Sequence, residues 1–109
     1  MKKKNTWYMY VLTCSDKSYY CGITTDLDRR VKEHNTSKKG AKYTRSRRPS
    51  VLIFYEEYSN RSEASKAECA FKKLTRRQKM NYMVRVCEAR HEKAVREWEE
   101  RSLKDVDRD

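Results

Sequence analysis

Residues 7–35 read WYMYVLTCSDKSYYCGITTDLDRRVKEHN, and this stretch decides the fold. Two segments, 6–13 and 18–24, are rich in aromatic and β-branched side chains, as strands are. A short polar turn at residues 14–17 separates them, so we predict an antiparallel hairpin.

The two hairpin strands present tyrosines in a defined order. Side chains alternate across a strand, so Tyr10 shares a face of the first strand with Leu12. On the second strand Tyr20 shares a face with Gly22. Tyrosine hydroxyls therefore stand on strand faces where apolar rings would serve a core.

A helix is predicted next, over about residues 26–36. Thr25 or Asp26 can cap its N-terminus, and Asp26 and Asp28 place negative charge in its first turn. Residues 37–50 are interpreted as a basic, irregular loop. The apolar run at residues 51–55 is predicted to be a third, buried strand.

Two further helices are predicted. Asn60 and Glu63 resemble a capping box that opens a helix of about 61–74, and Thr75 starts another that reaches Arg85 or beyond. We expect a domain over 1–85 and a charged extension over 86–109, either helical or disordered. A thin apolar stripe at 3-4-3-4 spacing either docks on the core or on a partner, or belongs to a frayed, solvated helix. Its members are Val84, Cys87, His91, Ala94 and Trp98.

The charge balance predicts an anionic partner. The chain holds 27 Lys and Arg against 16 Asp and Glu, a net charge of +11, and its pI is about 9.6. Residues 1–85 hold 21 against 8, a net of +13, whereas residues 86–109 hold 6 against 8, a net of −2. The anion-binding surface is therefore expected in the first 85 residues.

The sequence predicts a cytoplasmic protein without a membrane partner. No apolar run approaches the ~20 residues that cross a bilayer, and no signal-peptide segment follows Lys2-Lys3-Lys4. The four cysteines show no CxxC pair and no metal-ligand spacing. We interpret them as reduced, mostly packing residues.

Arg30 and His34 stand out on the first predicted helix. At 100° per residue both fall beside the inward Leu27 and Val31, so they should be neighbours near the core. One interpretation is structural: Arg30 extends its charged end to water and His34 makes a buried hydrogen bond. The other is that both side chains serve a functional site.

Glu68 interrupts the apolar stripe of the second helix, which is formed by Ala64, Ala67, Phe71 and Leu74. A buried, unpaired carboxylate is costly, so Glu68 should be paired, protonated or bound to a metal ion. A salt bridge is the structural interpretation. A single metal-binding carboxylate is the functional one.

The loop over 37–50 combines positive charge with an aromatic ring. Tyr-rich, Lys- and Arg-rich surfaces suit phosphates and stacked bases, although charge runs are also common on solvated faces. The candidate nucleic-acid-binding residues are Lys42, Tyr43, Arg45, Arg47 and Arg48.

The ordered motifs resemble the GIY-YIG nuclease family, in particular its short single-domain bacterial members. The first motif is Tyr8-Met9-Tyr10 and the second is Tyr20-Cys21-Gly22, with Arg30 ten residues after Tyr20. Tyr8, Met9 and Cys21 differ from the family's Gly and Ile residues, but the functional atoms belong to the tyrosines. The resemblance covers roughly residues 7–80 and implies an α+β fold with a small three-stranded antiparallel sheet flanked by helices.

The resemblance also implies a reaction, which is phosphodiester hydrolysis with one divalent metal ion. Glu68 would hold Mg²⁺ or Mn²⁺, with waters in the other positions. Tyr10 would take a proton from the attacking water and Tyr20 would position it, although the two can exchange roles. Arg30 would stabilise charge on the phosphate, and His34 would bind the phosphate or assist proton transfer. These five side chains should converge on one cleft.

These features predict a metal-dependent endonuclease that acts on DNA in repair or recombination, with a protein partner as a source of specificity. The alternative is a nucleic-acid-binding or accessory module of the same fold without catalysis. A basic RNA- or ribosome-associated protein is a third reading of the charge. Tyr10, Tyr20, Arg30, His34 and Glu68 together favour catalysis, because binding alone does not require a carboxylate in an apolar stripe.

Overall fold

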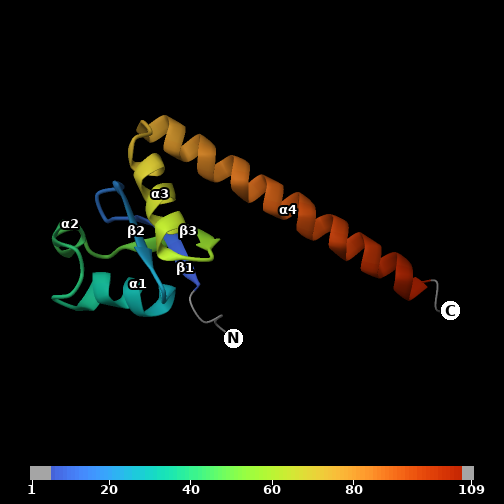
Figure 1. Cartoon of the computed structure of the whole chain (residues 1–109), viewed down its shortest axis with the longest axis horizontal. Helices are drawn as coiled ribbons and strands as arrows, with labels where there is room; N and C mark the ends of the chain where they lie inside the picture. Colours follow the sequence, from blue (N-terminus) through green and yellow to red (C-terminus); the bar gives the residue numbers. More distant parts are fainter. Residues whose placement is uncertain (1–5, 107–109) are drawn as a thin grey trace. The chain divides into compact units, whose positions relative to one another are not determined.

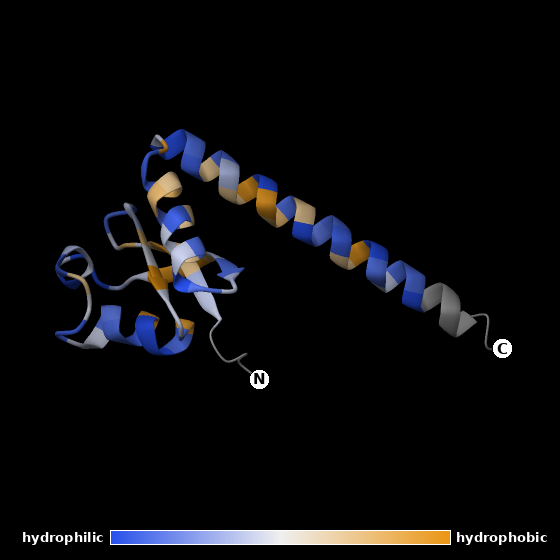
Figure 2. Cartoon of the chain, in the orientation of Figure 1, coloured by the Kyte–Doolittle hydropathy of each residue, from blue (hydrophilic) through white to orange (hydrophobic). Residues whose placement is uncertain are grey.

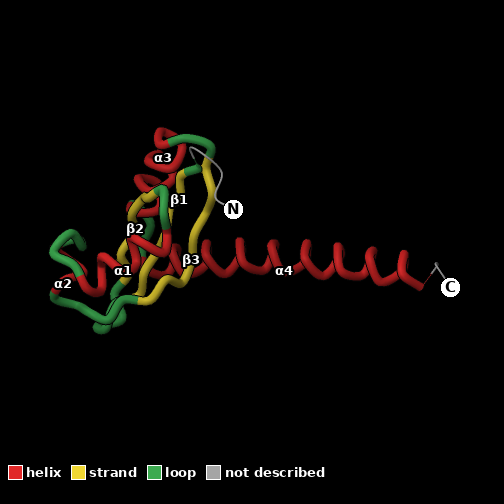
Figure 3. The backbone as a smooth tube through the Cα atoms, turned by 90° about the horizontal axis from the view of Figure 1, so that it is seen from below, coloured by secondary structure: helices red, strands yellow, loops and turns green. Residues whose placement is uncertain are grey.

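The computed structural model describes the backbone of residues 6–106 and the side chains of residues 6–101. Three strands, β1 (Trp7–Thr13), β2 (Tyr19–Thr24) and β3 (Val51–Tyr58), form one antiparallel sheet in the order β2-β1-β3 (Figure 1, Figure 3). The central strand is therefore β1. The predicted α+β class with a three-stranded antiparallel sheet is confirmed.

The β1–β2 hairpin places the tyrosines as predicted. Tyr10 pairs with Gly22 and Leu12 pairs with Tyr20, so the Tyr10 and Tyr20 side chains leave the sheet on the same face. The Tyr10 ring lies directly against Gly22. A Cβ atom at residue 22 would lie 2.6 Å from the Tyr10 hydroxyl oxygen, so glycine is what allows this close approach.

The third strand differs from its prediction. The apolar run at residues 51–55 predicted a buried strand, but β3 lies at the sheet edge, and Phe54 is its one buried residue. Val51 is 56% exposed and Tyr55 41% exposed. A run of apolar residues does not report how many neighbours a strand has, and β3 has only β1.

The helices on either side of β3 begin where the sequence indicates. In α1 (Leu27–Thr36), Asp26 is the N-cap and accepts a hydrogen bond from the Arg29 backbone at 3.1 Å. In α3 (Arg61–Lys72), Asn60 accepts from the Glu63 backbone at 2.9 Å.

The loop over residues 37–50 contains a single helical turn, α2 (Lys42–Arg45), where an irregular loop was predicted. A four-residue helix is too short to show an apolar period. Its backbone bonds converge on Ala41, whose carbonyl accepts from Thr44 and Arg45 at 3.1 Å each.

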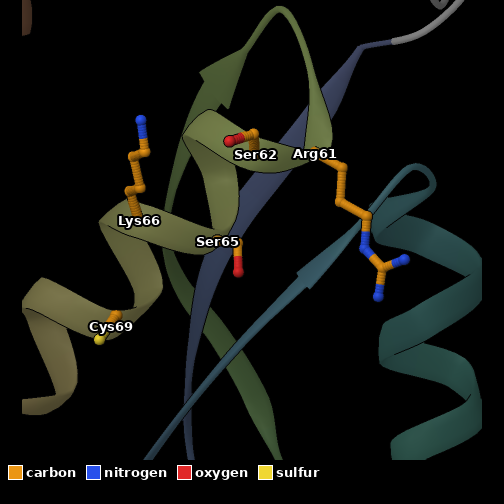
Figure 4. A pocket seen from close by; sticks show the side chains of 5 residues that line it. All are labelled: Arg61, Ser62, Ser65, Lys66 and Cys69. Atoms are coloured by element: carbon orange, nitrogen blue, oxygen red, sulfur yellow. The ribbon is translucent and has the colours of Figure 1, made fainter.

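The core lies on both faces of the sheet. His34 of α1 contacts Tyr10, so α1 covers the Tyr10 face. The guanidinium of Arg61, in α3, lies 5.6 Å from the centre of the Trp7 ring, and Trp7 points to the other face of β1. Figure 4 shows the strands between α3 and α1. On the α3 side the buried apolar residues are Met9, Val11, Cys21, Phe54, Ala64 and Phe71.

The last helix, α4 (Arg76–Val106), begins at a capping box. Thr75 Oγ1 accepts from the Gln78 backbone at 3.2 Å, and Gln78 Oε1 accepts from the Thr75 backbone at 2.9 Å, which confirms the predicted start. The chain forms two compact units that divide between Lys73 and Leu74. The Lys2-Lys3-Lys4 segment and residues 107–109 of the predicted extension lie outside the described residues.

Candidate active site

A chain of hydrogen bonds joins β1, α1 and α2 beneath the sheet face that carries the tyrosines. The Tyr10 hydroxyl lies 2.7 Å from His34 Nε2, and His34 Nδ1 lies 2.7 Å from Thr44 Oγ1. Thr44 Oγ1 donates to the Ala41 carbonyl at 3.0 Å, so it must accept from His34 Nδ1–H. His34 Nε2 then carries no proton and accepts the Tyr10 hydroxyl. The network therefore defines the tautomer of His34.

His34 is held in its neutral form. Its side chain is 0% exposed. Burial, followed by the nearby positive charge of Arg30, lowers the pKa of His34 to about 4. Both ring nitrogens are engaged, so direct contact with a phosphate would require one of these bonds to break. Of the two interpretations of His34, these surroundings favour the buried structural hydrogen bond.

We expect this buried histidine to make stability depend on pH. Below about pH 6.5 the unfolded chain protonates His34 while the folded chain does not, so the unfolded state binds more protons. The free energy of unfolding should therefore fall as pH drops from 6.5 to 4, by up to about 1.4 kcal/mol per pH unit from this group. Urea unfolding of the wild type and His34→Gln measures it. Equal pH slopes in the two proteins would contradict the expectation.

Arg30 lies beside this chain of bonds. Its Nη1 donates to Glu33 Oε1 at 3.1 Å and to the Lys39 carbonyl at 2.8 Å, and the side chain remains 24% exposed. Burial raises the pKa of Tyr10 above its usual range, and the interaction with Arg30 opposes only part of that rise. The guanidinium thus bonds Tyr10 as well as Glu33 and the Lys39 carbonyl, and it still reaches solvent, as a phosphate ligand requires.

The two tyrosines differ in access. Tyr10 is 1% exposed, whereas Tyr20 is half-buried. Their ring centres lie 6.4 Å apart, and the Tyr20 ring lies 5.0 Å from that of His34. Tyr10, Tyr20, Arg30 and His34 therefore form one group of side chains, here called the tyrosine cluster.

The basic loop is attached to the tyrosine cluster through Tyr43. The Tyr43 and Tyr20 rings stack with centres 6.2 Å apart, and the Arg47 guanidinium lies 3.8 Å from the Tyr43 ring centre. Arg47 also donates to Asp16 Oδ2 at 2.9 Å and to the Tyr43 carbonyl at 2.9 Å. Arg47 thus fixes the position of Tyr43, which stays 38% exposed.

Arg48 is bonded to the C-terminus of α1. Its Nε donates to the His34 carbonyl at 2.6 Å, and its Nη2 donates to the Ser37 carbonyl at 2.5 Å and the Glu33 carbonyl at 3.4 Å. The Glu33 carbonyl also accepts from the Ser37 N–H at 3.0 Å, and the Ser37 carbonyl from the Gly40 N–H at 3.2 Å. Arg48 therefore adds a charged donor to the carbonyls that close the end of α1. Of the five loop residues predicted to bind nucleic acid, Arg47 and Arg48 thus make internal bonds, whereas Lys42, Tyr43 and Arg45 are exposed.

We expect Arg48→Ala to destabilise the fold. Three backbone carbonyls would lose a charged donor, which should lower the free energy of unfolding by about 2 kcal/mol. Arg45→Ala is the matched control: it removes an exposed arginine from the same loop and should change stability by less than about 0.5 kcal/mol. Thermal or urea unfolding compares them, and equal losses in both variants would mean that the Arg48 bonds contribute nothing.

Glu68 lies on α3 and is paired. Its carboxylate is 3.3 Å from the Lys72 ammonium, and its side chain is 23% exposed. Of the interpretations open to this residue, the salt bridge is the one present in the described structure. Among the described contacts, none joins Glu68 to the tyrosine cluster. The described contacts therefore group Tyr10, Tyr20, Arg30 and His34. The convergence of Glu68 with them on one cleft stays a prediction.

The described residues contain no group of three or more His, Cys, Asp or Glu side chains that could enclose a metal ion. A single carboxylate open to solvent is nevertheless chemically suited to Mg²⁺, which keeps most of its waters and prefers oxygen ligands. Glu68 meets that description once Lys72 turns away, because Lys72 is itself 53% exposed.

Along the described part of the chain, no helix is both long and apolar enough to span a bilayer.

Two features of this region were not predicted from sequence. Thr44 completes the bonding of His34, but a threonine in a basic loop gives no signal of that role. A surface pocket also runs along α3, lined by Arg61, Ser62, Ser65, Lys66 and Cys69 (Figure 4). Its cations have partners, since Arg61 lies over Trp7 and Lys66 is 3.9 Å from Glu63.

Cys69 and Cys87 are exposed, whereas Cys14 and Cys21 pack inside as predicted.

Known proteins resemble the chain over the same region. The GIY-YIG catalytic domain model matches residues 6–81. The chain is 55% identical over 85 residues to the UPF0213 protein of Enterococcus faecalis, covering 76% of this chain and 96% of that protein. It is 53% identical over 79 residues to the UPF0213 protein YazA of Bacillus subtilis, covering 72% and 79%. The solution NMR structure of protein EF2693 from E. faecalis matches with a TM-score of 0.57 and 52% identity, over 79% of this chain and 91% of that one.

Proposed function

This chain belongs to the GIY-YIG family, which is nuclease-like, and on that premise we propose that it is a metal-dependent endonuclease. It hydrolyses phosphodiester bonds of DNA in the cytoplasm, in repair or recombination. One observation carries the proposal: within the family domain, two tyrosines, an arginine and a neutral histidine meet beside an exposed basic loop. A partner protein supplies specificity for DNA structure.

The side chains divide the work according to their exposure. Tyr20 reaches solvent and, in its phenolate form, accepts the proton of the attacking water. The buried Tyr10 bonds to His34 and fixes the site behind it. This is the exchanged assignment of the two tyrosines. Arg30 stabilises the charge that develops on the phosphate as water adds to phosphorus and the P–O bond to the leaving strand breaks.

Glu68 is the proposed ligand of one Mg²⁺ or Mn²⁺ ion. GIY-YIG nuclease domains are generally metal-dependent, and a bound divalent ion supplies positive charge for the phosphate and lowers the pKa of water. The residue's own part is to leave Lys72 and present an oxygen to the ion. The carboxylate stays 23% exposed, so water can still reach it when Lys72 leaves.

DNA binding should come from the exposed part of the loop. The double variant Lys42→Gln/Arg45→Gln removes two exposed cations and no internal bond, so it should weaken duplex binding several-fold at low salt without altering stability. The slope of log K against log salt should become shallower by about two. Fluorescence anisotropy over a salt series measures both. Unchanged affinity would place the binding surface elsewhere.

Incubation of the purified chain with branched, nicked, single-stranded and duplex DNA, with Mg²⁺, Mn²⁺ or a chelator, tests the proposal. We expect metal-dependent cuts in at least one substrate, lost in Tyr20→Phe. Salt-sensitive binding without cleavage of any substrate would favour the alternative, a nucleic-acid-binding module of the same fold.

A further inference from the structure

Helix α4 carries a row of exposed side chains that repeats at 4-3-4-3-4 spacing. Met80 is 48% exposed, Val84 49% and Trp98 67%. The row, here called the α4 seam, consists of Met80, Val84, Cys87, His91, Ala94 and Trp98. In Figure 2, apolar segments interrupt a hydrophilic helix along this length. Such spacing is that of the a and d positions where two helices pack.

The α4 seam does not include the least exposed residues of α4. Met83 is 7% exposed, and at 100° per residue it lies about 60° from the middle of the α4 seam. The half-buried Val86 lies about 120° from the middle of the α4 seam. Met83 and Val86 therefore lie outside the α4 seam, whose six residues are exposed.

The spacing of the α4 seam is the same when it is counted from either end. The midpoint in sequence is Ala89, which does not itself belong to the α4 seam. Two α4 helices laid antiparallel about Ala89 bring Met80 against Trp98 of the second copy. The same register brings Val84 against Ala94 and Cys87 against His91. Each contact joins an a position to a d position. At Val84–Ala94 a larger side chain packs against a smaller one. We propose that α4 pairs antiparallel with α4 of a second copy through the α4 seam.

The charge distribution favours this direction of pairing. Residues 76–86 carry four Lys and Arg and no Asp or Glu, whereas residues 92–102 carry three Lys and Arg and four Glu. Antiparallel helices place the +4 segment beside the −1 segment of the second copy, and parallel helices would place it beside another +4 segment. Helix dipoles also oppose each other favourably in antiparallel pairs. Glu88 lies near Glu88 of the second copy and Arg90 near Arg90, and these like-charge contacts weaken the pairing.

The pairing lies mostly outside the family domain. The family model ends at residue 81, and the match to the E. faecalis relative covers 96% of that protein but 76% of this chain. Five of the six seam residues follow residue 81. The self-association is therefore a property of the added part of α4 and is independent of catalysis.

Two alanines of α4 give a matched pair of variants. Ala94 lies in the α4 seam and Ala89 lies on the opposite side of the helix, and both are exposed. By sedimentation equilibrium of the full chain, the wild type should approach twice the 13.2 kDa monomer mass as concentration rises. Ala94→Glu should raise the dimer Kd at least tenfold, and Ala89→Glu should change it less than twofold. Circular dichroism confirms that both variants keep their helix.

Oxidative cross-linking tests the direction. In a Cys69→Ser chain, parallel helices would align Cys87 with its own copy and yield a disulfide-linked dimer. With helix axes 8–10 Å apart, facing Cα atoms lie roughly 4–6 Å apart across the seam. Antiparallel helices also offset the two Cys87 Cα atoms by about 6 Å along the axis, which brings their separation to about 7–8.5 Å, too far for a disulfide. His91→Cys in that background should restore cross-linking, from Cys87 to residue 91 of the second copy. A monomer at every concentration, equal effects of the two alanine variants, or a dimer cross-linked through Cys87 alone would each overturn the proposal.

Discussion

Glu68→Gln should reduce metal-dependent DNA cleavage by at least about a hundredfold. Glutamine keeps the shape of the side chain but loses the charge that would hold a divalent ion. Binding to DNA should remain within about twofold of wild type, because the exposed cations of the loop over 37–50 are untouched. Single-turnover cleavage across a Mg²⁺ series, with anisotropy for binding, separates the two effects.

The same substitution breaks the ion pair with Lys72, so a control must break a similar pair. Glu63→Gln does so on the same helix, where Glu63 lies 3.9 Å from Lys66 and is 54% exposed. Both changes should alter the free energy of unfolding by less than about 1 kcal/mol. Only Glu68→Gln should lose cleavage. If it cuts as well as wild type, Glu68 serves as a partner of Lys72 and the metal assignment is wrong.

Arg30→Ala should lower kcat by about 10² to 10³ while KM changes little. The reason is that the guanidinium interacts most strongly with the charge that appears on the phosphate during the reaction. Arg30→Lys retains one positive charge but loses the planar fork, so it should recover only a small part of the rate. Steady-state cleavage over a range of substrate concentrations distinguishes kcat from KM.

Arg29 provides the control for position and charge. It is an exposed arginine next to Arg30, and only its backbone is used, in the cap made by Asp26. Arg29→Ala removes the same charge from the same helix and should leave kcat within about twofold. Arg30 also bonds Glu33 and the Lys39 carbonyl, so unfolding of each variant must be measured. A loss confined to KM would make Arg30 a binding residue only.

The sequence allowed most of the fold to be predicted because its signals are local. The side chains that cap helices hydrogen-bond a backbone group within three residues, as at Asp26, Asn60 and Thr75. Such local bonds mark where the helices start. Alternation along the hairpin strands gave the shared face of Tyr10 and Tyr20. The edge position of β3 was missed because it depends on sheet order, a property of the whole domain.

The site was predictable only in part for the same reason. Helical spacing put Arg30 and His34 together near the core, and the structure places them beside both tyrosines. In the sequence the three arginines at 45, 47 and 48 could not be told apart. In the structure Arg48 donates to carbonyls of α1, and Arg47 donates to Asp16. These partners are 11 to 31 residues away in sequence. No local pattern distinguishes an arginine that faces solvent from one that closes a loop.

The contact between Gly22 and the Tyr10 hydroxyl constrains how this domain can diverge. Any side chain at position 22 would enter the space that the Tyr10 phenol occupies, and Tyr10 is bonded to His34. The effects of mutating the two positions are therefore not additive. Alanine at 22 should be harmful beside tyrosine and tolerated beside a smaller residue at position 10. A lineage must therefore lose the phenol at position 10 before it can gain a side chain at position 22. Once position 22 holds a side chain, the tyrosine cannot return in one step.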